Sequence, residues 1–298
     1  MAEKPSQPMK LTIKYSVIKK NAHYGCHNLT SVTIQPPKCK HECNHECKHG
    51  RKGRKGRKGR RQECRRKRKQ ERRHKRKQKR GCIYIENGAF GWCTGLENVA
   101  IKSNNDVIIG SKAFRSCTSL KSFVLPARTE AIGEEIFAWC SRLSFVVIPK
   151  TVTAIGARAF AQCLILELLK LPGSIEIGEG AFQCSGIVSI VLSEEVNVIK
   201  AFTFADCRKL EKLTTTTTKS NLGTKGAFII PGSVTEIGKC AFINCTEMTS
   251  LILPDGLTII GELAFFGCHN LKEVVIPDSV TKIGRNAFDP HTKLVRPS

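Results

Sequence analysis

The chain has 298 residues, with 49 Lys and Arg against 25 Asp and Glu, and its formal net charge is +24. Its apolar fraction of 41% is enough to bury a core, which excludes a wholly disordered chain. The charge is uneven, because residues 38–82 hold 23 Lys and Arg and 4 Asp and Glu, a net of +19, which leaves +5 for the rest.

The N-terminus, MAEKPSQPMK, lacks the apolar run of a secretory signal. No stretch of about 18 consecutive apolar residues occurs anywhere, so a membrane-spanning helix is not expected. We therefore expect an intracellular protein, cytoplasmic or nuclear, with no membrane partner. Residues 1–37 hold an N-terminal segment and a first copy of the repeat described below.

Residues 38–82 form a low-complexity insertion that begins with cysteine and histidine at every second position. Thiolate and imidazole ligands at this density could hold zinc or copper. The spacing is not that of a zinc finger, and a straight strand would spread the side chains too far apart to enclose one ion. Two interpretations stay open: a weak metal site, or a repeat with incidental affinity. The candidate ligands are Cys39, His41, Cys43, His45, Cys47 and His49.

The rest of the insertion is basic. RKGRKGRKGRR (51–61) is followed by RRKRKQERRHKRKQKR (65–80), which has no Gly or Pro. We expect this part to be disordered, or helical once its charge is neutralised. Two basic clusters resemble a nuclear import signal, and the same charge would bind RNA or an acidic partner without reading sequence; the third interpretation is an expansion with no role. The candidate residues are Arg65, Arg66, Lys67, Arg68, Lys69, Arg72, Arg73, Lys75, Arg76 and Lys77.

A period of 23 residues runs through the rest of the chain, and cysteine marks it. Successive cysteines lie 67, 24, 23, 23, 21, 23, 38 and 23 residues apart, where 67 is 23 plus a 44-residue insertion and 38 is 23 plus 15. A fixed short period indicates a solenoid, in which stacked repeats share one continuous core. The cysteines are Cys26, Cys93, Cys117, Cys140, Cys163, Cys184, Cys207, Cys245 and Cys268.

The period has the consensus C-x-x-L-x-x-V-x-I-P-x-S-V-T-x-I-G-x-x-A-F-x-x. The alternation in L-x-x-V-x-I predicts a strand, and the proline removes a donor and ends it. The glycine suits a turn with positive φ, and Ala-Phe fills the interior with one small and one large side chain. We expect a mostly β solenoid with short turns or helices, in which parallel strands lie about 4.8 Å apart and about nine repeats span roughly 45 Å.

Three runs carry a resemblance to a known family: IPKTVTAIGARAFAQC (148–163), IPGSVTEIGKCAFINC (230–245) and IPDSVTKIGRNAF (276–288). They resemble the BspA-like, or Treponema pallidum type, leucine-rich repeat, over about residues 11–37 and 83–291. The resemblance implies a curved right-handed solenoid with its strands in a parallel concave sheet, and a role in adhesion or protein binding. The first repeat is degenerate, with Lys19 in the glycine slot and His23 in the phenylalanine slot.

The residues between the inward pairs of each strand are expected to face outward on the concave sheet. An apolar cluster spans four adjacent turns there, and a monomer rarely exposes such a patch without use. The alternative is that β-branched residues occupy these positions because strands favour them. The predicted protein-binding residues are Val124, Phe145, Val147, Leu168, Lys170, Val191, Ile252 and Val275.

The nine cysteines are expected to form a column with about 5 Å between neighbours. Their parallel Cα–Cβ bonds would not suit disulfides, so we expect buried, reduced thiols that pack as small apolar side chains, which favours a reducing compartment. A second insertion in the solenoid of residues 83–298, TTTTTKSNLGTKGAF (214–228), is expected to be a Thr-rich loop.

No Ser/His/Asp, Cys/His or paired-carboxylate set recurs in positions that a solenoid would bring together, so we do not expect an enzyme. Three functions follow. The preferred one is a scaffold that grips an unknown protein on the concave sheet. The second is a nuclear or nucleolar adapter that binds RNA or acidic partners through the basic insertion. The third, a cell-surface adhesin, follows only from the resemblance. No cofactor is expected apart from zinc or copper in the insertion.

Overall fold

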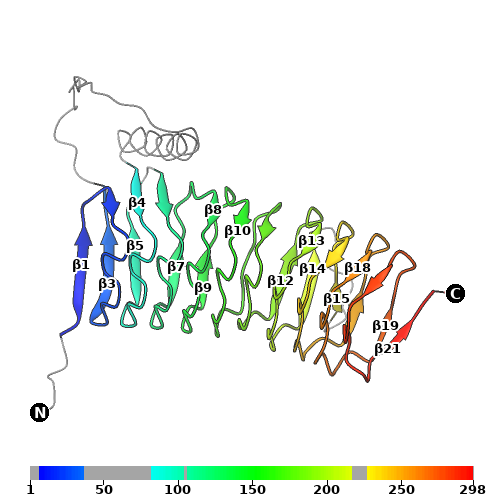
Figure 1. Cartoon of the computed structure of the whole chain (residues 1–298). Helices are drawn as coiled ribbons and strands as arrows, with labels where there is room; N and C mark the ends of the chain where they lie inside the picture. The colour runs from blue at the N-terminus through cyan, green and yellow to red at the C-terminus, as the bar shows by residue number, and fades with distance from the viewer. Residues whose placement is uncertain (1–6, 37–81, 104–105, 217–226, 298) are drawn as a thin grey trace, which may run out of the picture.

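The computed structural model describes residues 7–36, 82–103, 106–216 and 227–297, and it shows one elongated solenoid (Figure 1). The chain winds through about ten turns of parallel strands, and no helix occurs in these ranges. The predicted fold class is confirmed. The array has about ten turns rather than nine, since strands β1 (Met9–Ile13) and β21 (Lys293–Val295) extend it at both ends.

The first strand of each turn belongs to what we call the main sheet, the one that the resemblance puts on the concave side. Its strands are parallel, and within the described residues they form four hydrogen-bonded groups rather than one continuous sheet. Besides β1 and β21, they are β3 (Leu29–Ile34), β5 (Asn98–Ile101), β7 (Ser122–Val124), β9 (Phe145–Val147), β12 (Ser189–Leu192), β14 (Lys212–Thr215), β15 (Ala227–Ile229), β17 (Ser250–Ile252) and β19 (Glu273–Val275).

The other strand of each turn is short and belongs to the opposite side, which we call the second sheet. Its register is constant, since Ile155 pairs with Ile132 on one side and with Ile177 on the other. Its strands are β2 (Val17–Ile18), β4 (Ile83–Ile85), β6 (Val107–Ile109), β8 (Ala131–Ile132), β10 (Ala154–Ile155), β11 (Glu176–Ile177), β13 (Val198–Ile199), β16 (Glu236–Ile237), β18 (Ile259–Ile260) and β20 (Lys282–Ile283).

The core follows the repeat as predicted. Val274 and Ile276 are buried, and so are the Ala-Phe pairs. The aromatic side chains stack in one continuous column with ring centroids 5.2 to 5.9 Å apart, a favourable separation for aromatic pairs. We call this column the aromatic ladder: His23, Phe90, Phe114, Phe137, Phe160, Phe182, Phe204, Phe242, Phe265 and Phe288.

The polar positions of the repeat link one turn to the next. Thr258 Oγ1 donates to the carbonyl of Thr235 at 2.9 Å, and Thr281 Oγ1 donates to the carbonyl of Thr258 at 3.3 Å. Ser279 Oγ likewise donates to the carbonyl of Leu257 at 2.7 Å. The S-V-T element therefore supplies hydroxyl donors for carbonyls of the preceding turn.

The glycine of the repeat has a different role from the predicted one. In the described ranges, positive φ among glycines occurs only at Gly25, Gly88, Gly180 and Gly267, none of which is in the I-G slot. A Cβ on Gly156 would lie 2.6 Å from the backbone nitrogen of Glu134 in the preceding turn. The prediction of a positive-φ turn was wrong: glycine is needed there because successive turns approach too closely for a side chain.

The segment 214–228 was wrongly predicted to be only a loop. Its two ends belong to β14 and β15, which pair at Leu213 and Phe228, and β15 continues the sheet to β17. In the second sheet β13 pairs directly with β16, so the main sheet gains one strand that the opposite side lacks. Residues 217–226 lie outside the described ranges.

The basic insertion leaves the solenoid between β3 of the main sheet and β4 of the second sheet. Ile83 of β4 pairs with Val107 of β6, so the repeat has resumed there. Cys82 is already buried, with 1% of its surface exposed, and is therefore part of the folded solenoid. Residues 37–81 lie outside the described ranges, and the division into three domains stays a prediction.

Candidate protein-binding surface

The structure places all eight predicted binding residues on the outward face of the main sheet. Val124 pairs with Val147, and Val191 pairs with Thr214, so these residues share one column. Phe145 and Leu168 lie in the neighbouring column, opposite Ser122 and Ser189. All eight are exposed, and the seven apolar ones range from 39% at Val147 to 69% at Leu168. Phe123 and Val146, which alternate with them, are buried.

Six of the eight form one patch, and two lie apart. We call the patch the central cluster: Val124, Phe145, Val147, Leu168, Lys170 and Val191. Ile252 and Val275 lie in the same column beyond β14, whose outward residues are Lys212 and Thr214. The sequence prediction treated these two groups as one surface, but a polar strand separates them.

The sequence prediction missed two members of the column, Ile229 and Val295. Ile229 of β15 pairs with Ile252, and Val295 of β21 pairs with Val275. The signal for Ile229 was present, because AFIIP (227–231) fits the V-x-I-P part of the consensus. It was overlooked because the Thr-rich segment was interpreted as a loop throughout.

The main sheet is interrupted in the middle of the central cluster. Strand β9 pairs with β7, and Leu168 of the next turn bridges only to Ser189 in the turn after it. No backbone hydrogen bond joins residues 144–148 to residues 165–173, all of which the structure describes. The second sheet and the aromatic ladder continue without a break at the same turns, so the two turns are separated on one side only.

A groove of 860 Å³ opens at this interruption, and we call it the central groove. One wall consists of residues 144–148 with Lys150, and the other of Ile165, Glu167, Leu168 and residues 170–173. Ile148 and Leu171 occupy a core slot of the repeat but are only partly buried here, although Leu192 in the same slot is completely buried. The groove therefore exposes apolar side chains in a slot that most other turns bury, Ile101 being partly buried as well.

The rim of the central groove is positively charged. Glu167 is neutralised by Lys209, whose Nζ lies 3.5 Å from Glu167 Oε1. Lys150 and Lys170 are exposed and have no ion-pair partner among the described residues. Two lysine charges are therefore available to an occupant.

The cysteine column is confirmed for eight of its nine predicted members, and Cys184 was wrongly included. Ser185 occupies the slot and is buried, whereas Cys184 precedes it, is half-buried and has a φ of 54°. The error arose because two successive turns have 22 residues, from Cys163 to Ser185 and from Ser185 to Cys207. The 21 and 23 spacings of the cysteines hid this change.

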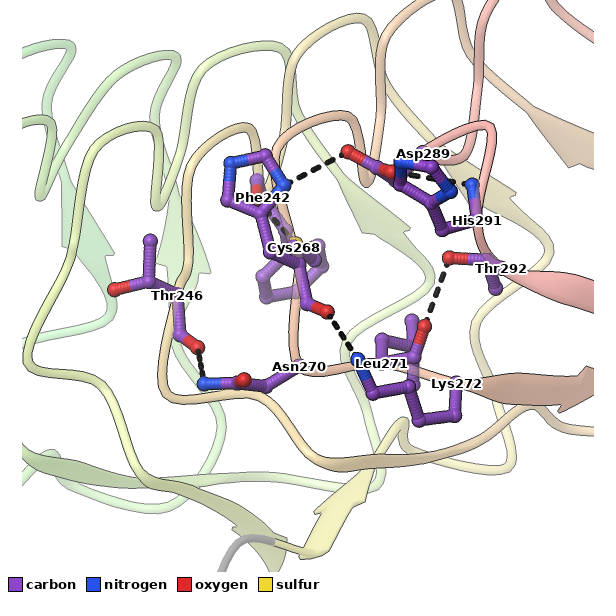
Figure 2. Close-up of polar contacts among 10 residues, drawn as sticks. Phe242, Thr246, Cys268, Asn270, Leu271, Lys272, Asp289, His291 and Thr292 are labelled. Atoms are coloured by element: carbon purple, nitrogen blue, oxygen red, sulfur yellow. Dashed lines mark hydrogen bonds and ion pairs between the residues drawn. The ribbon is translucent and has the colours of Figure 1, made fainter.

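The column thiols are free, and the seven from Cys93 to Cys268 act as donors as well as packing groups. Cys117 Sγ donates to the carbonyl of Phe90 at 3.2 Å, and Cys268 Sγ donates to the carbonyl of Phe242 at 3.2 Å (Figure 2). Burial raises the pKa of the Cys207 and Cys268 thiols to about 12. These groups therefore stay protonated at neutral pH, which suits a structural role and not a nucleophile or metal ligand.

The last turn has His291 in the cysteine slot and uses other polar links (Figure 2). The buried Asp289 carboxylate accepts a hydrogen bond from the backbone N–H of His291 at 3.2 Å and contacts His269 Nδ1 at 3.0 Å. Thr292 Oγ1 donates to the carbonyl of Leu271 at 2.8 Å. The contacts of Asp289 with His269 and of Thr292 with Leu271 join the final turn to the one before it, where no thiol is present.

Two groups of predicted site residues cannot be placed. The candidate metal ligands from Cys39 to His49 and the basic candidates from Arg65 to Lys77 lie outside the described ranges and stay predictions. Within those ranges no group of three His, Cys, Asp or Glu side chains is arranged to hold a metal ion. The same part of the chain contains no helix that is long and apolar enough to span a membrane.

Residues 107–228 and 224–296 match the family model described as the BspA type leucine rich repeat region, and the match is to a region of 6 repeat copies. Three solved structures are similar. The leucine rich repeat protein of T. pallidum is 27% identical, with 64% of this chain and 83% of that chain covered and a TM-score of 0.52. A leucine rich cell surface protein from Faecalibacterium prausnitzii A2-165 is 21% identical, with 95% and 70% covered and a TM-score of 0.53. A leucine-rich repeat protein from Eubacterium ventriosum ATCC 27560 is 19% identical, with 71% and 58% covered and a TM-score of 0.54. No curated protein matches the sequence.

Proposed function

The chain belongs to the BspA-type leucine-rich repeat family, and we propose that it is a non-enzymatic scaffold that binds a protein partner on the outward face of its main sheet. The observation that carries the proposal is the central cluster, in which Phe145 and Leu168 are exposed by 55% and 69%. Exposed apolar patches on soluble proteins mark interaction sites, and large aromatic and aliphatic side chains are the usual anchors of such interfaces.

We also propose that the protein is not an enzyme and that it is intracellular. The seven column thiols other than Cys26 are buried and have raised pKa values, so they are poor nucleophiles. We keep the intracellular location because free thiols persist in a reducing compartment. One similar structure is described as a cell surface protein, but at 21% identity this similarity concerns the fold. Labelling of intact cells with a membrane-impermeant reagent tests the location, and efficient labelling of this chain would contradict it.

The binding surface is tested by replacing Phe145 and Val147 together with aspartate. Both side chains point outward, so the free energy of unfolding should change by no more than about 1 kcal/mol, while capture of the partners bound by the wild-type chain should be lost. The matched control replaces Ser31 and Thr33 with aspartate, because these residues occupy the same two columns on β3. We expect the control to retain the partners.

Two outcomes contradict the proposal. A folded Phe145/Val147 variant that still captures every wild-type partner shows that the surface lies elsewhere. Equal loss of capture in the Ser31/Thr33 control shows that added charge on the sheet, and not removal of the apolar patch, disrupts binding.

A further inference from the structure

The central groove lies between two strand segments whose facing edges are not joined by backbone hydrogen bonds. Strand β9 pairs with β7 on one edge, and the segment around Leu168 bridges to β12 on the other. The edges that face the groove make no backbone hydrogen bond to each other within the described structure. An open strand edge is a template for one more strand, because its N–H and C=O groups lie in a row.

The side chains around this edge would suit the alternation of an added strand. Phe145, Leu168 and Ile165 are exposed on the two walls, and Ile148 and Leu171 are partly exposed. Successive side chains of a strand point to opposite faces. A segment along β9 would therefore direct every second side chain toward these apolar groups and the others toward solvent and the rim.

The rim determines the charge of the occupant. Lys150 and Lys170 belong to opposite walls, and neither has an ion-pair partner among the described residues, whereas Glu167 is already paired with Lys209. An acidic occupant would gain attraction from both lysines, and a basic occupant would be repelled by them.

We propose that the central groove binds an extended segment of a partner protein that pairs as a strand with the open edge of β9 and carries acidic residues alternating with apolar ones. The inference rests on the proposed function, because it specifies the segment that the scaffold takes. Main-chain hydrogen bonds would supply the pairing, the apolar side chains the contact with Phe145 and Leu168, and the carboxylates the contact with Lys150 and Lys170.

The experiment measures the fluorescence anisotropy of labelled peptides with the full chain. The probe is an acetylated peptide in which Glu alternates with Val and Phe. One comparison peptide has Lys in place of every Glu, and another keeps all side chains but carries N-methyl groups at alternate backbone nitrogens, which removes the donors of one edge. We expect the Glu peptide to bind and each comparison peptide to bind about tenfold more weakly or worse, which corresponds to about 1.4 kcal/mol.

A charge-reversal variant distinguishes attraction by the two rim lysines from attraction by the overall positive charge of the protein. Replacing Lys150 and Lys170 with glutamate should weaken the binding of the Glu peptide about tenfold and strengthen the binding of the Lys peptide. The matched control replaces Lys102 and Lys282 with glutamate, because both are exposed lysines outside the lining of the groove. This control has the same net charge and should bind the Glu peptide as the wild type does.

Each contrary result overturns the inference. Equal binding of the N-methylated peptide excludes strand pairing, equal binding of the Lys peptide excludes the charge preference, and no binding of any peptide excludes an extended acidic occupant. None of these results concerns the natural partner. The proposed function fails separately, when the Phe145/Val147 aspartate variant still captures that partner.

Discussion

The aromatic ladder and the two sheets differ in how strictly they repeat. On the second-sheet side the aromatic ladder is continuous, and Phe204 stacks on Phe242 at 5.2 Å even though β14 and β15 lie between them in the chain. Strand pairing, in contrast, is interrupted in both sheets of the described structure: after β5, β9 and β17 in the main sheet and after β6 and β11 in the second sheet. The main sheet also has one added strand. Because the ladder is continuous where both sheets are interrupted, it holds the turns together, which leaves the main sheet free to vary where a partner would bind.

The largest expected effect compares two phenylalanines in the same turn. Phe160 is fully buried in the ladder, and Phe145 is exposed on the main sheet. Phe160→Ala should lower the free energy of unfolding by about 3 to 5 kcal/mol, because it empties a large site in a packed core. Phe145→Ala should change it by about 0.5 kcal/mol or less. Denaturant titration of both variants measures the difference, and equal costs would show that Phe145 also supports the fold.

A smaller effect is expected from the glycines. Gly156→Ala would place a Cβ 2.6 Å from the backbone of the preceding turn, and backbone cannot move aside easily. Overpacking of this kind costs about 1 to 3 kcal/mol. Gly173→Ala, on the wall of the central groove, meets nothing within 4 Å and serves as the control. If both substitutions shift the denaturation midpoint equally, close approach between turns is not the reason for the I-G slot.

The thiol column offers a third comparison. Cys163 Sγ donates to the carbonyl of Phe137 at 3.3 Å and is completely buried. Cys163→Ala removes this donor, and the net value of such a bond predicts a loss of about 1 kcal/mol. Cys184→Ala should cost less, because Ser185 and not Cys184 occupies the slot. Thermal unfolding measures both, and a greater cost at Cys184 would mean that our assignment of the slot is wrong.

The sequence was sufficient for the features that recur at every turn. The alternation of Val274 and Ile276 identified the inward face of the strand, and the Ala-Phe pair identified the core. These positions repeat because the same burial is required in each turn, so a period alone reveals them. The outward columns followed from the same alternation, which is why all eight candidate residues are exposed.

The sequence could not predict positions where a different residue type fills a repeat slot. It also could not predict positions where the distance between backbones of successive turns determines which residue fits. Ser185 replaces a cysteine because a hydroxyl also fits the slot, and counting cysteines could not detect the exchange. The reason for Gly156 depends on the distance to Glu134 in the preceding turn, which the repeat does not encode. The central groove depends on the hydrogen bonds missing after β9, although Phe145 and Leu168 were identified from the pattern alone.

The smallest effect is expected from removing residues 38–81. This deletion tests whether the stability of the aromatic ladder is independent of the insertion. Ile34 and Ile85 are 51 positions apart, and removing 44 leaves 7, the same as the separation of Ile148 and Ile155. The deletion keeps Cys82, which is buried, and His23 remains stacked on Phe90 at 5.2 Å across the junction. Because the cost of loop closure changes only slowly with length, the free energy of unfolding should change by about 1 kcal/mol or less. Calorimetry of the shortened chain measures this, and loss of the cooperative transition would mean that the insertion supports the first turns directly, so that the ladder alone does not hold them together.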